Sequence, residues 1–82
     1  MKHQVLQIDA WAGCDEGSWE WNNWYKIAKT DTIPDTVEQF LALLGADADA
    51  SKFEIEDDGH NIVLIHIEDR EPLFAVEYGN TI

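Results

Sequence analysis

Basic residues are scarce in this chain of 82 residues. Five Lys and Arg stand against 17 Asp and Glu, which gives a formal net charge of −12. Such a chain repels phosphates, so we expect no direct binding to nucleic acid and none to an anionic membrane surface. The charge favours a basic partner, although an acidic surface that only keeps a small protein soluble is an equally good interpretation.

Cysteine is nearly absent as well. Cys14 is the one cysteine, so no intramolecular disulfide can form, and its acidic neighbours Asp15 and Glu16 disfavour a reactive thiolate. No apolar run approaches the ~20 residues of a membrane helix. The first residues also lack the apolar core of a signal peptide. We therefore expect a reduced, cytoplasmic protein.

The chain has enough apolar residues for a core. Aliphatic and aromatic residues make up 45% of it, and the sequence contains neither internal repeats nor low-complexity segments. A chain of this length forms one domain. We predict a single domain over residues 1–82.

The most unusual stretch is Ser18 to Ile27, which holds three of the four tryptophans. With the two-residue period of a strand, residues 19, 21, 23, 25 and 27 share one face, which we expect to be buried. The other face is polar except for Trp24. A hairpin turn at Asn22 and Asn23 is the alternative, since Asn tolerates positive φ, but one long strand is preferred.

Period-two patterns predict further strands. Together with the aromatic stretch, the expected strands cover residues 3–11, 18–29, 52–57, 60–69 and 73–78. Asp58-Gly59 is a two-residue hairpin signal. The strand over 60–69 is apolar on both faces, which is typical of a central strand.

One helix is expected over residues 35–44. Asp35 is the predicted N-cap, with Glu38 completing a capping box, and Gly45 is placed to end the helix. The expected buried stripe consists of Val37, Phe40, Leu41 and Leu44.

The predicted fold class is α+β, an antiparallel sheet of about five strands in the order β-β-α-β-β-β with one helix on one face. Three helical turns cannot cover five strands. Since Ile62 and Leu64 lie opposite Val63 and Ile65, the second sheet face should be partly wet or covered by a partner. This predicts an interaction module or a homodimer formed through the apolar sheet face.

No pattern predicts a metal, a cofactor or a catalytic site. Asp47-x-Asp49-x-Ser51 begins like a calcium loop, but Lys52 occupies the position that requires glycine. His60 and His66 lie ~20 Å apart on a strand and cannot share a metal. His66 and Glu68 could form an acid–base pair, but no nucleophile accompanies them. We therefore expect a non-enzymatic protein.

Acidic residues concentrate at one predicted sheet edge, on Glu54, Glu56, Asp57 and Asp58. Carboxylates at strand spacing, ~7 Å for i to i+2, approach the phosphate spacing of DNA, so this edge could occupy a basic groove. The alternative is an edge strand protected by charge against aggregation. Trp24 is the predicted anchor of such a contact, because tryptophan is enriched among binding hot spots. The alternative places Trp24 beneath the loop over 12–17.

Three segments resemble small acidic proteins encoded by bacteriophages and prophages: Trp19-x-Trp-Asn-Asn-Trp-Tyr-Lys-Ile27, Val5-Leu-Gln-Ile-Asp-Ala-Trp11 and Val76-Glu-Tyr-Gly79. That class includes anti-CRISPR inhibitors of bacterial defence. The resemblance implies an inhibitor acting in the host cytoplasm, and it transfers no functional residue. The leading hypothesis is an inhibitor that binds the basic nucleic-acid-binding surface of a host defence complex as a DNA mimic.

Overall fold

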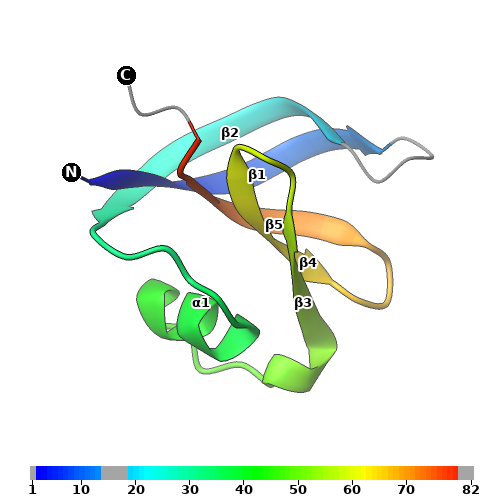
Figure 1. The fold of residues 1–82 in the computed structure, drawn as a ribbon. Helices are drawn as coiled ribbons and strands as arrows, with labels where there is room; N and C mark the ends of the chain where they lie inside the picture. The colour runs from blue at the N-terminus through cyan, green and yellow to red at the C-terminus, as the bar shows by residue number, and fades with distance from the viewer. Residues whose placement is uncertain (1, 14–18, 80–82) are drawn as a thin grey trace.

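The computed structural model describes the backbone of residues 2–13 and 19–79, and the side chains of residues 2–9 and 23–79. Figure 1 shows a strongly twisted sheet with one short helix on one of its sides. The strands are β1 (His3–Gly13), β2 (Trp19–Thr30), β3 (Phe53–Asp57), β4 (Asn61–His66) and β5 (Glu71–Glu77). The sheet order is β2-β1-β5-β4-β3, and every neighbouring pair is antiparallel. The predicted fold class and element order are confirmed.

The long form of β2 is confirmed, because it continues through Asn22 and Asn23 without a turn. Its ladder with β1 is irregular, however. The register skips Asp9 on β1, and Asn22 and Ile27 on β2. Each skipped residue is a bulge that interrupts strict alternation. The predicted alternation of residues 19–27 between two faces therefore holds only over Asn23–Lys26. It is wrong at Asn22 and at Ile27, where the bulges break it.

The strand predicted over 60–69 is shorter, since β4 ends at His66 and residues 67–70 form a turn. In that turn Arg70 has a φ of 57°, the left-handed region that non-glycine residues rarely adopt. Strand β5 begins at Glu71 and includes Pro72. The ladder is irregular there, because Leu64 pairs with Phe74 and Ile65 with Pro72. A strand proline is tolerated at such a bulge.

Helix α1 (Val37–Leu44) begins one residue later than predicted, because Thr36 and not Asp35 is the N-cap. The Thr36 hydroxyl accepts a hydrogen bond from the Gln39 amide at 3.1 Å, and the Gln39 side chain accepts one from the Asp35 amide at 2.7 Å. Two amides that lack helical partners are thereby satisfied. Gly45 ends the helix as predicted, with a φ of 69° and its amide bonded to the Ala42 carbonyl.

The sheet face beneath α1 carries the first core. Phe40 is fully buried and Leu41 is 6% exposed, and they pack with Val5, Leu64 and Val76. Val37 and Leu44 join this core at its margin. The predicted helix stripe is thus confirmed.

The opposite face, called here the second face, is formed by Leu6, Ile8, Val63, Ile65 and Ala75. None of these five side chains is more than 7% exposed. The expectation of a partly wet second face is therefore wrong for its central residues: Val63 and Ile65 are fully buried within a single chain. The reason for expecting a homodimer through this face is removed with it.

Candidate functional site

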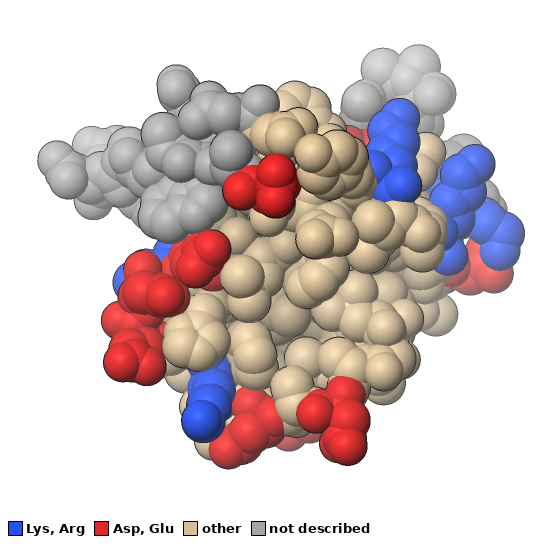
Figure 2. Space-filling view, turned by 180° about the vertical axis from the view of Figure 1, so that it is seen from behind, with Lys and Arg blue, Asp and Glu red and all other residues tan. Residues whose placement is uncertain are grey.

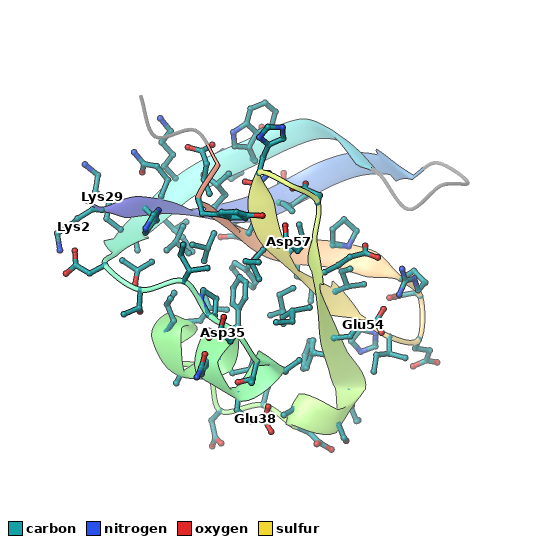
Figure 3. All side chains as sticks on the ribbon, in the orientation of Figure 1. Lys2, Lys29, Asp35, Glu38, Glu54 and Asp57 are labelled. Carbon is teal, nitrogen blue, oxygen red and sulfur yellow. The ribbon has the colours of Figure 1, made fainter. Side chains whose placement is uncertain are left out.

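The four predicted acidic residues lie on β3 and on its turn to β4, at one edge of the sheet. We call this group, Glu54, Glu56, Asp57 and Asp58, the acidic margin. Figure 3 labels two of them, Glu54 and Asp57. The strand pairing divides the group between the two faces of the sheet. Glu54 and Glu56 pair with Ile65 and Val63, so they lie on the second face. Asp57 instead ends β3, where it pairs with Ile62 of the first core, and Asp58 begins the turn to β4.

Glu54 and Glu56 share one cation. The guanidinium of Arg70 forms an ion pair with Glu54, and its second terminal nitrogen lies 3.9 Å from Glu56 Oε1. All three side chains are 40–52% exposed, so solvent screens the pairs and they stabilise the fold only weakly. One cation opposes two carboxylates, so the group keeps a net negative charge. Sequence reasoning missed Arg70, because only the left-handed turn before β5 brings it back over β3.

Asp57 is committed to internal hydrogen bonds. The Tyr78 hydroxyl donates to its carboxylate, and the Gly59 amide donates to the same oxygen at 2.9 Å. The bond from Tyr78 and then the bond from Gly59 hold the pKa of Asp57 below its ordinary value. The same contact raises the pKa of Tyr78 to about 12. Asp57 therefore links the β3–β4 turn to Tyr78, the residue that follows β5.

Asp58 has a local structural role too. Its carboxylate accepts from the amides of His60 and Asn61 at 2.9 and 2.7 Å. Gly59, which lies between Asp58 and His60, has a φ of 94°, a value that a residue with a side chain rarely adopts. The predicted hairpin is confirmed, but its two central residues are Gly59 and His60 and not Asp58 and Gly59, because the Asp58 amide donates to the Asn61 carbonyl. The Asp58 side chain closes the same turn.

Replacing Tyr78 with phenylalanine should lower stability in a pH-dependent manner. A depressed Asp57 pKa stabilises the fold above the carboxyl's ordinary value of 3.8, and this contribution is lost as the pH falls further. The elevated Tyr78 pKa stabilises the fold below its ordinary value of 10.0, and this contribution is lost as the pH rises through about 12. Urea unfolding should therefore show the largest difference between parent and Tyr78→Phe near neutral pH, narrowing at both extremes.

Tyr25→Phe is the matched control, since the Tyr25 hydroxyl contacts Asn23 and not Asp57. The difference in unfolding free energy between Tyr25→Phe and the parent should not become smaller at acidic pH. A Tyr78→Phe difference that stays constant from pH 7 to below the ordinary Asp value would contradict this role for the contact.

Trp24 does not join the acidic margin. It lies on β2, and three strands separate β2 from β3. Four strand spacings place the two edges ~19 Å apart. The Trp24 side chain is 46% exposed and its residue pairs with Ile8. The loop predicted over 12–17 lies largely outside the described residues. The structure therefore gives two separate candidate surfaces where the sequence predicted one.

Lysines gather at the Trp24 edge. Lys26 pairs with Leu6 and Lys29 with Gln4, which lie two residues apart on β1, so both lysines are on the second face. Lys2 is nearby, where it forms an ion pair with Asp31 at 3.1 Å. In Figure 3 the labelled Lys2 and Lys29 lie on the side of the molecule opposite Glu54. Figure 2 shows blue groups at the upper right with red beside them, a further blue group at the lower left, and most of the red groups along the left and lower margins.

The histidine and calcium patterns have local explanations. His66 lies 3.2 Å from Asp69 and not against Glu68, and its ring meets Phe53 edge to face. Asp49 accepts from the amide and the hydroxyl of Ser51, capping a short 3₁₀ turn, η1 (Ala50–Lys52). Within residues 2–13 and 19–79, no three His, Cys, Asp or Glu side chains are grouped to hold a metal ion.

One hollow lies between the end of β2, the segment after it and α1. Its volume is about 690 Å³, and its lining includes Lys29, Thr30, Ile33, Asp35 and Leu43. The lining is mixed, with one cation and one carboxylate. It can accept a side chain or a small polar molecule, but it holds no grouped acid, base and nucleophile among the described residues.

Comparison of the chain with protein-family models, with curated proteins and with solved structures finds no match. No described helix is long and apolar enough to cross a membrane. The geometry thus defines a small α+β domain with Glu54 and Glu56 on one edge strand of its sheet and Lys26 and Lys29 on the other.

Proposed function

We propose that this protein is a non-enzymatic inhibitor that docks its acidic margin onto the basic, nucleic-acid-binding surface of a host protein or defence complex. The observation that carries this proposal is the concentration of negative charge on and around β3. Nine carboxylates fall between residues 47 and 71, against Lys52 and Arg70 alone. The rest of the chain holds the other three cations, Lys2, Lys26 and Lys29, and eight carboxylates, so about −7 of the net charge of −12 falls on residues 47–71. Lys26 and Lys29 lie on β2, at the far edge of the sheet.

Charge gathered on one side steers association. A basic groove attracts the acidic side over about a Debye length, ~8 Å at physiological salt, and orients the molecule before contact. The three lysines turn away from such a groove. An inhibitor that competes with nucleic acid needs an acidic side that is attracted to the groove and basic groups that face away from it. The same arrangement of side chains meets both requirements.

Within the acidic margin, the contact residues are Glu54 and Glu56. Both carboxylates are partly exposed, and Arg70 offsets only part of their charge. Asp57 and Asp58 contribute to the field, but their oxygens are committed to the turn. Trp24 is too distant to anchor the same small contact, so the proposal assigns it no part there.

The test is capture from a nuclease-treated bacterial lysate by the immobilised protein, with duplex DNA as competitor. Captured proteins should be nucleic-acid-binding, and DNA should release them. Neutralising the pair with Glu54→Gln and Glu56→Gln should weaken capture about tenfold, since rim charges mainly set association.

The matched control is Asp35→Asn with Glu38→Gln, which also removes two negative charges, but at the start of α1. Figure 3 labels both residues. Each costs stability only through the helix dipole, about 0.3–1 kcal/mol. If control and test variants lose capture equally, net charge alone is responsible. That result, or capture that DNA does not reverse, would contradict the proposal.

A further inference from the structure

The sheet ends on two strands, β2 and β3, and each has only one neighbour within the described residues. An edge strand presents unpaired amides and carbonyls that can pair with another strand. The two edges differ in length and chemistry. Strand β2 has 12 residues and carries lysines, whereas β3 has five and carries carboxylates.

The edge formed by β2 is also the apolar one. Trp24, Tyr25 and Ile27 are 46%, 50% and 46% exposed, three of the five exposed large apolar side chains among the described residues. Exposed apolar side chains in a row on an edge strand favour pairing with a further strand. The charged side chains beside these apolar residues determine which strand can pair with the β2 edge.

Lys26 and Lys29 have the spacing of alternate strand residues. They are three apart in sequence, but the bulge at Ile27 removes one position, so their partners Leu6 and Gln4 are two apart. The two ammonium groups therefore stand on one face at ~7 Å spacing along β2. A strand suited to this edge carries two carboxylates at alternate positions on the same face.

Strand β3 has this pattern. Glu54 and Glu56 are two apart, and both lie on the second face, as Lys26 and Lys29 do. Arg70 is one cation for both carboxylates, and both side chains are partly exposed, so their charge is only partly offset. Both halves of a complementary pair of edges are therefore present on one molecule.

Strand direction agrees with this pairing. Five strands joined by four antiparallel pairings place the first and last, β2 and β3, in the same direction. A second copy in the same orientation, set beside the first, would form a parallel β2–β3 pair that continues the sheet. In that register Lys26 faces Glu54, and Lys29 faces Glu56.

We propose that the protein self-associates head to tail, with β2 of one copy pairing with β3 of the next through the Lys26–Glu54 and Lys29–Glu56 contacts. A symmetric β2–β2 dimer brings the lysine-bearing edges together and lacks this complementarity. The contact is heterologous, so it produces a series of oligomers that grows with concentration and not a closed dimer. The inference is tested on this chain alone, but it uses Glu54 and Glu56, the contact residues of the proposed function, so self-association and docking compete for the β3 edge.

Sedimentation velocity of mixed charge variants tests the proposal. Lys26→Glu with Lys29→Glu makes both edges acidic, and Glu54→Lys with Glu56→Lys makes both edges basic. Each variant should sediment as a monomer up to about 1 mM, while the parent associates in the micromolar to millimolar range. An equimolar mixture of the two variants should associate again, because each edge then meets its complement.

Two controls accompany the mixture. A chain with all four substitutions should associate by itself. The Lys26→Glu, Lys29→Glu variant leaves β3 and Arg70 unchanged, so it tests the contact even where lysines at 54 and 56 fold poorly beside Arg70. Lys2→Glu makes the chain more acidic outside both edge strands and should associate like the parent. A parent that remains monomeric at about 1 mM, or a Lys26→Glu, Lys29→Glu variant that associates like the parent, would overturn the proposal.

Discussion

Replacing Phe40 with alanine will lower the free energy of unfolding by about 3–5 kcal/mol, as expected for a fully buried phenylalanine. Phe40 joins the helix to the sheet, packing with Val5, Leu64 and Val76. Apart from the first core, α1 has few attachments to the rest of the fold, and a helix of eight residues is not stable alone. Loss of the ring therefore removes the packing that holds α1.

Denaturant titration measures this effect. Ala42→Ser is the control, since it changes the exposed side of the same helix and costs about 0.5 kcal/mol through helix propensity. A cost below about 1 kcal/mol for Phe40→Ala would contradict the packing of α1 on this face.

Ile65→Ala will cost about 2–5 kcal/mol, because the side chain is fully buried in the second face and leaves a cavity. This prediction separates a core from an interface. If the second face were exposed in the monomer, the substitution would cost little and would instead weaken association.

Ile67→Ala is the matched control two residues along, in the turn after β4, where the side chain is 45% exposed. It should cost well under half as much in the same urea titration. Equal costs at the two positions, or a cost for Ile65→Ala that depends on protein concentration, would show that the second face is not an internal core.

The fold was largely predictable because its signals are local and periodic. The α1 stripe, the left-handed Gly45 and the Asp58-Gly59 turn each follow from residues adjacent in sequence. The prediction at the helix start was wrong because Thr36 competes with Asp35, and the hydroxyl of the later residue reaches the Gln39 amide. Neighbouring cap formers differ too little in preference for the sequence to rank them.

The candidate site was less predictable because it depends on sheet order. The residues of the acidic margin are adjacent in sequence, so their proximity was foreseeable. The distance of Trp24 from them follows from the pairing of β1 with β5, which no local pattern indicates. The matching faces of Lys26 and Lys29 depend on a bulge at Ile27, and the pairing of Arg70 depends on one left-handed residue.

The pairing of β1 with β5 also determines the order in which the fold can form. Strands β1 and β2 form one hairpin, and β3, β4 and β5 form a meander, so both can assemble from neighbouring residues. Val5 pairs with Val76, and this junction closes a loop of about 70 residues. Long-range closure of this kind slows folding. The two ends of the chain must therefore meet in the late step that completes the sheet, and the edge of β5 remains open to wrong partners until β1 arrives.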